Sequence, residues 1–246
     1  MNNFKIIRLS KTNLYLLTLA QGYMLIDCGY EKDRDLFVSR LKSLDIGIDE
    51  IQYLFLTHHH DDHSGLTNFL TGKNPSIRVI MHQRCKDLIS TGMNERAENG
   101  GWCSRTAGFV AEFYHSFHPE WTLTFPPYTV RDGDYVIQGE EDTILSDIGL
   151  NARVLFTPGH TPDSISILDS SGNLFCGDAA ANYLKWAGTG YSPVYISDLQ
   201  EYYKSWGKII ASGVRMLHPA HGRPFPVDKL IKQKGRIREL ADFNWD

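Results

Sequence analysis

The sequence of 246 residues predicts a mixed α/β fold, with one domain over residues 1–246. Short apolar runs rich in β-branched and aromatic residues alternate with segments whose apolar residues recur at helical spacing. Several strand-like runs also end at a histidine or an aspartate, and functional groups commonly gather where strands end in layered α/β proteins. An apolar content of 42% is enough to fill the core of such a domain.

The first 91 residues alternate between strand and helix signals. Runs rich in Ile, Leu and Tyr predict strands, and Gln21-Gly22 supplies a turn between two of them. Leu36, Phe37, Leu41 and Leu44 form an apolar stripe at helical spacing, and a glycine follows as a stop. The elements predicted here are strands at 4–9, 13–19, 22–27, 51–57 and 77–81 and helices at 33–45, 64–70 and 83–91.

Residues 92–127 have a different character, with a Gly-Gly pair, several aromatic residues, Pro126-Pro127 and a predicted helix at 105–117. Two interpretations fit this segment. It is a lid or substrate-binding insertion, or it is a structural helical excursion that packs on the core.

The rest of the chain returns to strands followed by helices, without repeats or low-complexity linkers. The elements predicted here are strands at 128–131, 135–138, 152–156, 164–168 and 173–177 and helices at 197–211 and 227–240.

The most informative motif is His58-x-His60-x-Asp62-His63, which follows the apolar run 51–57. It places four ligand-type side chains within six positions, and imidazole and carboxylate are ligands that borderline divalent metals prefer. A purification tag would lie at a terminus and would not interleave aspartates after a strand. The sequence therefore predicts a metal site at the end of this strand.

Three later strand-like runs repeat this arrangement. The run 152–156 leads into Thr-Pro-Gly-His160, the run 173–177 leads into Asp178, and a run from Arg215 leads to His221. Each of these residues alone has an ordinary reading as a turn residue. Their joint occurrence in this order favours a shared metal site.

Together these residues resemble the ligand set of the metallo-β-lactamase superfamily, and the resemblance covers about residues 4 to 225. It implies a four-layered αβ/βα sandwich. Carried over by position, the resemblance assigns one metal to His58, His60 and His160, a second to Asp62, His63 and His221, and the bridging position to Asp178.

The chemistry of the side chains agrees with this division. His58 and His60 are two positions apart in a turn, so their rings can converge on one ion, whereas Asp62 and His63 are adjacent and diverge. A carboxylate has two oxygens and can span two cations. Two divalent ions, two aspartates and a bridging hydroxide leave a net charge of about +1, which stabilises an oxyanion. We therefore expect hydrolysis by a metal-bridging hydroxide, with Asp62 as a hypothetical participant in proton transfer.

The other histidines and the interleaved residues receive ordinary interpretations. His59 and Asp61 are expected to be solvated or to orient the ligands. The histidines outside the motif set are expected to lie on the surface or to pack, although two of them lie in the 92–127 segment, where they can reach a substrate; they are His82, His115, His118 and His218.

Within the resembled family, several branches fit this sequence poorly. True β-lactamases typically have Cys or Ser in the region of Asp178, and flavodiiron proteins usually have Glu at the position of His60. Glyoxalase II enzymes continue into a sizeable helical domain after the last histidine, whereas 25 residues follow His221 in this sequence. The long tRNA-processing nucleases carry a nucleic-acid-binding arm, and no such arm is visible in this sequence. The expected substrate is therefore a small lactone, ester or thioester. Residues 183–195 are candidates for the apolar pocket, with loop packing as the alternative.

Other functions stay open. The chain is alternatively a phosphodiesterase, a metal-binding effector sensor with little turnover, or an oxygen-consuming enzyme with a single iron. Two divalent metal ions are expected, with zinc first and iron, cobalt or manganese as alternatives.

Composition excludes some classes of protein. A net charge of −4 argues against a general nucleic-acid binder, and the absence of a long apolar run argues against a membrane span. The chain lacks a secretory signal pattern and its four cysteines show no close pairing, so reduced thiols and a cytoplasmic location are expected. A C₂ homodimer is the default oligomer.

Overall fold

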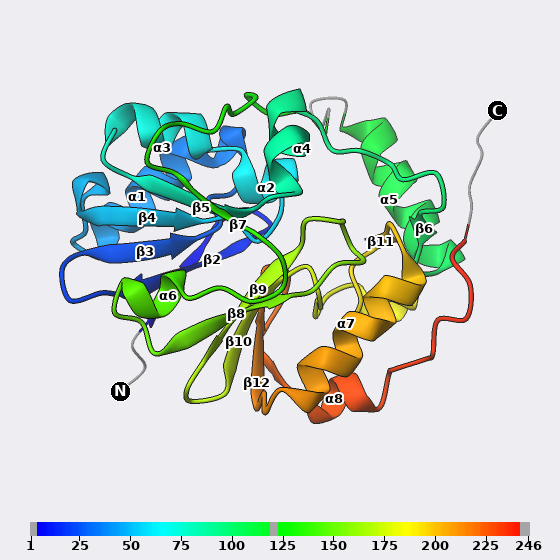
Figure 1. The fold of residues 1–246 in the computed structure, drawn as a ribbon. Helices are drawn as coiled ribbons and strands as arrows, with labels where there is room; N and C mark the ends of the chain where they lie inside the picture. The colour runs from blue at the N-terminus through cyan, green and yellow to red at the C-terminus, as the bar shows by residue number, and fades with distance from the viewer. Residues whose placement is uncertain (1–3, 119–122, 242–246) are drawn as a thin grey trace. The chain divides into compact units, whose positions relative to one another are not determined.

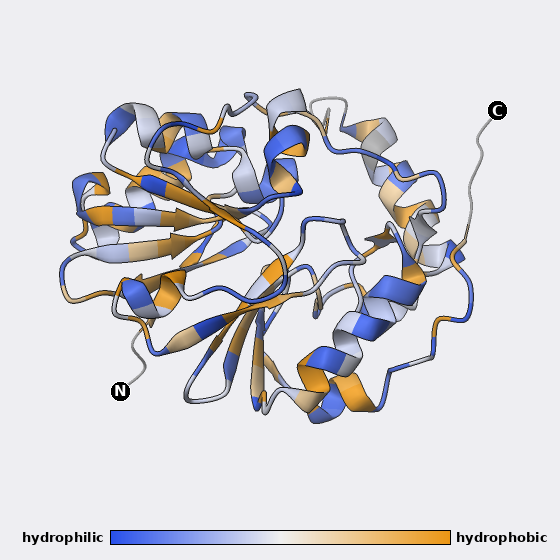
Figure 2. Cartoon of the chain, viewed as in Figure 1, coloured by the Kyte–Doolittle hydropathy of each residue, from blue (hydrophilic) through white to orange (hydrophobic). Residues whose placement is uncertain are grey.

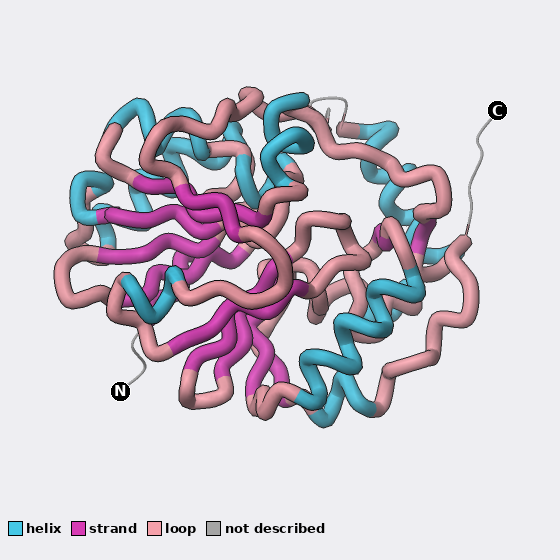
Figure 3. The backbone as a smooth tube through the Cα atoms, in the orientation of Figure 1, coloured by secondary structure: helices cyan, strands magenta, loops and turns pink. Residues whose placement is uncertain are grey.

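The computed structural model describes residues 4–118 and 123–241. The chain divides into two compact units: the first comprises Met1–Asn94 and Leu123–Val154, and the second comprises Glu95–Thr122 and Leu155–Asp246. The segment from Glu95 therefore leaves the first unit and belongs to the second. Helices, strands and loops are distinguished in Figure 3.

The first unit contains a six-stranded sheet in the order β1-β2-β3-β4-β5-β7. Strands β1 to β3 form an antiparallel meander, and the pairs β3–β4, β4–β5 and β5–β7 are parallel. The strands are β1 (Phe4–Arg8), β2 (Asn13–Thr18), β3 (Tyr23–Ile26), β4 (Ile51–Phe55), β5 (Arg78–His82) and β7 (Tyr135–Ile137). Because β3, β4 and β5 are parallel, their carboxyl ends lie at the same edge of the sheet.

Helices lie beside the sheet of the first unit (Figure 1), and they contribute apolar side chains to its core. Phe37 and Leu41 from α1, Leu70 from α3 and Ile89 from α4 are buried in one cluster with strand residues such as Leu25. The helical elements are η1 (Glu31–Asp33), α1 (Arg34–Ser43), η2 (Ile48–Glu50), α2 (Asp61–Ser64), α3 (Thr67–Lys73), α4 (Cys85–Thr91) and α6 (Ile144–Asp147).

The second unit contains a five-stranded sheet in the order β13-β12-β10-β9-β8 and a two-stranded sheet of β11 and β6. Strands β10 and β12 are parallel, so the segments that follow them begin at the same edge. The strands are β6 (Gly101–Trp102), β8 (Ala152–Phe156), β9 (Ile165–Asp169), β10 (Asn173–Gly177), β11 (Tyr195–Ile196), β12 (Met216–Pro219) and β13 (Phe225–Pro226).

Helix α7 supplies much of the core of the second unit. Its buried Tyr202, Trp206 and Ile209 cluster with strand residues such as Leu174 and Leu217. The Asp198 side chain caps its first turn by accepting hydrogen bonds from the backbone N–H groups at positions 200 and 201. The helical elements are α5 (Arg105–Phe117), η3 (Lys185–Ala187), α7 (Leu199–Ala211) and α8 (Asp228–Ile231). Figure 2 shows the apolar residues concentrated along the strands of both units.

These elements confirm the predicted mixed α/β class and most of the predicted positions, including the helix at 105–117. The prediction of a strand at 128–131 is wrong. Tyr128 donates its O–H to Asp134 at 2.6 Å, and the N–H of Arg131 donates to the same carboxylate at 2.8 Å. The backbone N–H of Tyr128 donates to the carbonyl of Ile89 at 3.1 Å, so these N–H groups bond to a helix residue and a side chain and not to a neighbouring strand.

The predicted helix at 227–240 is also wrong beyond Ile231, where α8 ends. Gly235 has a left-handed φ of 79°, which interrupts helical continuation. The N–H of Ile237 then donates to the hydroxyl of Tyr203 at 2.8 Å. The predicted short helix at 64–70 is divided between α2 and α3. Within the ranges that the structure describes, no helix is long and apolar enough to cross a membrane.

Candidate metal centre

The loop after β4 carries the first set of predicted ligands. Its backbone turns at His60, which precedes the single turn of α2 and accepts the N–H groups of His63 and Ser64 at 2.9 Å. The whole motif is buried, with His58 only 1% exposed and His63 0% exposed. Burial of so many imidazoles and carboxylates is costly unless they are bonded to each other or to an ion, so this turn has the character of a functional site.

The side chains of this loop converge. The ring centroids of His58 and His63 are 3.9 Å apart, and those of His58 and His60 are 4.7 Å apart. Ligand atoms of His58 and His60 lie within 4.8 Å of each other, and Nε2 of His63 lies 3.5 Å from Oδ2 of Asp62. All four predicted ligands of the first unit are therefore brought together.

Asp27, which the sequence analysis did not select, orients this loop. It follows β3 with a left-handed φ of 58°, and its carboxylate accepts the N–H of Thr57 at 2.8 Å. Its second oxygen lies 2.8 Å from Nδ1 of His63, which donates to it. The proton on Nδ1 leaves Nε2 of His63 available to a cation. The available sequence signal was an acidic residue at the end of the predicted strand 22–27.

The interleaved residues are buried rather than solvated. The side chain of Asn94 brackets Asp61, because its Nδ2 donates to the carboxylate at 2.8 Å and its Oδ1 accepts the backbone N–H at 2.8 Å. Burial, followed by the charge of Asp62, raises the pKa of Asp61 to about 7. Asp61 is thus held in the loop by Asn94, and His59 is also buried; a ligand-orienting role stays a prediction for both.

The second unit carries the other predicted ligands. Asp178 follows β10, and its two carboxylate oxygens face two different imidazoles: Oδ2 is 3.6 Å from Nε2 of His160, and Oδ1 is 3.5 Å from Nε2 of His221. This is the arrangement expected of a carboxylate that spans two cations. The three predicted ligands of the second unit are therefore also brought together.

Backbone contacts fix the position of His160. Its Nδ1 bonds to the backbone carbonyl of Tyr195 at 2.9 Å, which again leaves Nε2 for a ligand role. The preceding Gly159 has a φ of 130°, and a Cβ atom there would lie 2.3 Å from Cα of Tyr202 in α7. Only glycine allows the turn to approach the helix this closely.

Helix α7 and the loop after Asp178 hold the other two ligands. The indole N–H of Trp206 donates to the carbonyl of Ala179 at 2.8 Å. The N–H of Asn182 donates to the carbonyl of His221 at 2.8 Å, and its side-chain amide donates to the carbonyl of Arg223 at 2.7 Å. The segments after β10 and β12 are thus tied to each other by Asn182.

The residues predicted for a pocket after Asp178 have different surroundings. Lys185 donates to the hydroxyl of Tyr191 at 3.0 Å, and the Tyr191 ring packs on Phe225 at 4.4 Å, so both take part in loop packing. The Tyr183 ring lies 5.3 Å from that of His221, and Trp186 is 73% exposed. For Tyr183 and Trp186, contact with a substrate stays a prediction.

Two of the histidines outside the motif set pack in the interior. His82 and His218 are buried, and Nε2 of His218 donates to Asn173 Oδ1 at 3.0 Å. Burial lowers the pKa of His218 to about 4. All four cysteines are buried thiols, and Cys176 lies in the core of the second unit. Burial raises the pKa of the Cys28 and Cys103 thiols to about 12, so these two are unreactive near neutral pH.

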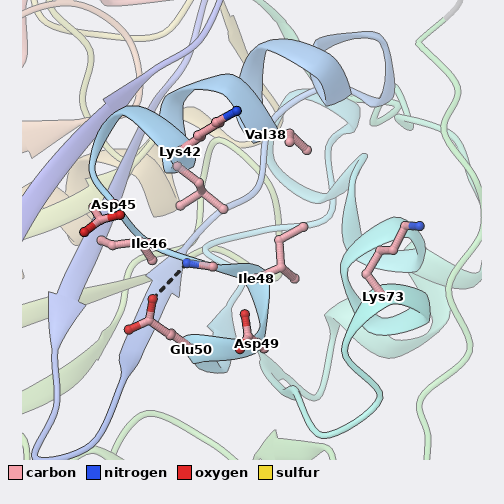
Figure 4. A pocket seen from close by; sticks show the side chains of 10 residues that line it. Val38, Lys42, Asp45, Ile46, Ile48, Asp49, Glu50 and Lys73 are labelled. Atoms are coloured by element: carbon pink, nitrogen blue, oxygen red, sulfur yellow. Dashed lines mark hydrogen bonds between the residues drawn. The ribbon is translucent and has the colours of Figure 1, made fainter.

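A cavity of about 610 Å³ opens elsewhere in the first unit, between α1, η2 and α3 (Figure 4). Lys42 and Lys73 line it, and Glu50 accepts the N–H of Gly47 at 2.8 Å. Because η2 leads into β4, this cavity lies at the amino end of that strand, whereas the histidine loop follows its carboxyl end. It is separate from the candidate centre.

The family model of the Metallo-beta-lactamase superfamily matches residues 7–221, and the chain belongs to this superfamily. Solved structures of similar fold include a subclass B3 metallo-beta-lactamase, BJP-1 of Bradyrhizobium japonicum, with a TM-score of 0.65, 19% identity and coverage of 97% of this chain and 89% of that one. A metallo-beta-lactamase family protein of Thermus thermophilus has a TM-score of 0.66, 20% identity and coverage of 97% and 80%. The predicted fold class is thereby confirmed.

The curated relatives are longer proteins, and this chain matches only a part of each. The Lactamase-like protein adaB of Aspergillus niger is 27% identical over 240 residues, covering 95% of this chain and 58% of that protein. The Beta-lactamase-like protein 2 homolog of Drosophila melanogaster is 26% identical over 225 residues, covering 90% and 63%. The Atrochrysone carboxyl ACP thioesterase of Aspergillus fumigatus is 25% identical over 218 residues, covering 87% and 52%. The chain thus spans 52 to 63% of the length of these relatives.

Proposed function

We propose that this chain is a metal-dependent hydrolase whose two ligand sets act together on two divalent cations. In this proposal one cation is held by His58, His60 and His160, the other by Asp62, His63 and His221, and both by Asp178. The observation that carries the proposal is the position of Asp178, whose two oxygens each face a different imidazole at 3.6 and 3.5 Å.

The donor set fits divalent cations. Neutral imidazoles and carboxylates suit zinc, and also iron or manganese. Asp27 and the carbonyl of Tyr195 hold the Nδ1 atoms of His63 and His160, so both rings can present Nε2. A bound divalent cation supplies a Lewis acid and lowers the pKa of a coordinated water.

The protein side of the reaction follows from the same contacts. Asp61 and Asn94 hold the loop that carries Asp62, and Asp27 holds His63 beside it. Asp62 is our candidate for accepting a proton during hydrolysis, because its carboxylate lies 3.5 Å from the ligand nitrogen of His63 and thus beside the proposed cations. The rigidity of this loop keeps the acceptor in place while the substrate reacts.

The proposed substrates are small-molecule esters, lactones or thioesters. Support comes from Asp178, whose carboxylate faces His160 and His221, and from a relative whose name is that of a thioesterase. We propose that the segment 92–127 is a substrate-binding insertion and that zinc is the native metal. We also propose that the protein is cytoplasmic and forms a homodimer. No nucleic-acid partner is proposed.

Metal analysis combined with a substrate panel tests the proposal. The chain is stripped with a chelator, reloaded with zinc, manganese or iron, and assayed on lactones, aryl esters, thioesters and phosphodiesters. We expect two metals per chain and metal-dependent hydrolysis of a carboxylic ester bond, lost in His160→Gln and kept in the non-ligand control His218→Gln.

Three results would contradict the proposal. Two metals without turnover of any substrate would favour the effector sensor. Exclusive cleavage of phosphodiesters would favour that alternative activity, and one iron per chain with oxygen consumption would favour a redox enzyme.

A further inference from the structure

Helix α5 presents a row of exposed aromatic side chains in the second unit. Phe109, Phe113 and Phe117 are 50%, 56% and 67% exposed. They are four residues apart, so they share one face of the helix. The ring centroids of Phe109 and Phe113 are 6.0 Å apart, and those of Phe113 and Phe117 are 4.7 Å apart. Three adjoining exposed phenylalanines form a patch of the kind that marks a binding surface, unlike singly scattered apolar residues.

The N-terminal end of α5, which we call its base, is joined to the strand that orients His160. Strand β6, three residues before the helix, pairs with β11 through Trp102 and Tyr195. The carbonyl of that same Tyr195 bonds to Nδ1 of His160 at 2.9 Å. The helix therefore starts from the backbone that positions a proposed metal ligand.

The base of α5 is also joined to the loop after Asp178. The hydroxyl of Ser104 donates to the carbonyl of Ala187 at 2.5 Å and accepts the N–H of Ala107, in the first turn of the helix, at 3.1 Å. In this loop, the Tyr183 ring lies 5.3 Å from the His221 ring, and Trp186 is 73% exposed. Aromatic side chains thus extend from a proposed ligand to the base of the helix.

One ion pair and one exposed cation lie along α5. Glu112 is paired with Arg96 at 3.1 Å, so that carboxylate is neutralised. Arg105 is exposed and lies four residues before Phe109, at the end of the helix that adjoins the ligand-bearing segments. A polar group at this end and an uncharged aromatic row beyond it suit a molecule with a polar reacting end and an apolar tail.

We propose that the Tyr183–Ala187 loop and α5 bind the acyl chain of the substrate, which makes this protein a hydrolase of esters or thioesters with long, uncharged acyl chains. The inference rests on the proposed function for the reacting end and names the substrate class. Eight residues of helix span about 12 Å, so the row by itself offers contact to roughly ten carbons of an extended chain.

We call the row of Phe109, Phe113 and Phe117 the ridge. The inference is tested by comparing how the hydrolysis rates of the wild type and of a ridge variant depend on the length of the acyl chain. All three are changed to Ser, and Ile231→Ser, at a 51% exposed residue on α8, serves as the control. Aryl esters from acetyl to decanoyl are assayed with the zinc-loaded proteins. In the wild type and the control, kcat/KM is expected to rise at least about tenfold from acetyl to decanoyl, because each buried methylene adds binding free energy. The triple variant should keep the acetyl rate and lose the rise.

A binding experiment separates this inference from the proposed function. N-decylacetamide, a neutral amide, is titrated against tryptophan fluorescence, which includes the exposed Trp186. Ridge-dependent binding without hydrolysis of any ester would uphold the acyl surface and reject the hydrolase. Hydrolysis with a flat chain-length profile, or a profile unchanged in the triple variant, would overturn the acyl surface and leave the hydrolase standing.

Two further measurements identify other occupants of the ridge. Light scattering that shows a wild-type dimer dissociated by the triple variant would assign the ridge to a second copy of the chain. Ridge-dependent binding to phosphatidylcholine vesicles would assign it to a lipid surface. Either result would overturn the inference, whereas a ridge-independent mass and no vesicle binding are the expected outcomes.

Discussion

Oδ2 of Asp27 lies 2.8 Å from Nδ1 of His63, and the other oxygen of this carboxylate holds the backbone of Thr57. A residue at the end of β3 therefore sets both the tautomer of a proposed ligand and the course of the loop that carries it. Both partners are buried, so the hydrogen bond is protected from competition by water.

We predict that Asp27→Asn weakens metal binding about 10- to 100-fold, because loss of an outer carboxylate partner typically has this effect. Competition with a chromophoric chelator measures the affinity. Asp33→Asn is the matched control: Asp33 is a buried carboxylate of the same unit whose Oδ2 accepts the hydroxyl of Ser10 at 2.7 Å. Equal losses of metal affinity in the two variants would reject a specific role for Asp27.

Asp178→Asn should reduce the metal content from two per chain to one or fewer, because an amide supplies only one oxygen and no charge to the bridging position. Hydrolysis should fall by about 10²-fold or more. Elemental analysis and steady-state kinetics measure the two effects. Asp169→Asn changes a carboxylate of the same unit that accepts the N–H groups of Ser171 and Asn173 and the side-chain amide of Asn173, and it should retain both metals. Two metals bound with unchanged turnover in Asp178→Asn would remove it from the bridging position.

Gly159→Ala should destabilise the fold by about 3 kcal/mol or more, because strain at positive φ and overlap with α7 act together. A Cβ atom would lie 2.3 Å from Cα of Tyr202. Gly72→Ala is the control: a Cβ atom added at this position of α3 would meet no atom within 4 Å, so the change should stabilise by about 0.4–1 kcal/mol. Urea unfolding measures the free energies of unfolding of both variants. Similar values for Gly159→Ala and Gly72→Ala would show that the turn at Gly159 can move away from α7 with little loss of stability.

The free energy of unfolding should depend on His218 below neutral pH. Burial lowers the pKa of this imidazole from 6.5 to about 4 in the folded protein. Between these values the unfolded chain binds a proton that the folded chain does not, so the stabilisation is complete above pH 6.5 and is lost as the pH falls towards 4. The loss is at most about 3 kcal/mol.

His218→Gln keeps a side-chain donor for Asn173 but removes this titration, so the difference in unfolding free energy between wild type and variant should shrink as the pH is lowered through this window. A difference that is constant from about pH 7 to about 4 would contradict the role assigned to His218.

The local sequence determined the positions of most helices and strands and the superfamily of this protein. The strands at 152–156 and 173–177 and the helix at 105–117 lie where their apolar patterns predicted them, because that periodicity arises from backbone geometry within one element. The superfamily was predictable for a similar reason. Four of its seven ligand-type residues lie in one turn, and each of the other three follows a recognisable apolar run.

Contacts between distant parts of the chain decided which groups orient the proposed metal ligands. Asp27 and His63 are 36 positions apart, and the carbonyl that holds His160 belongs to Tyr195, 35 positions later. A backbone carbonyl carries no residue signature, so that partner has no signal in the sequence. Beyond the end of α8 at Ile231, the N–H of Ile237 likewise bonds to the hydroxyl of Tyr203, 34 positions earlier in the chain. Such partners become neighbours only when the sheets form, because hydrogen bonds depend on distances in space and not on spacing along the chain.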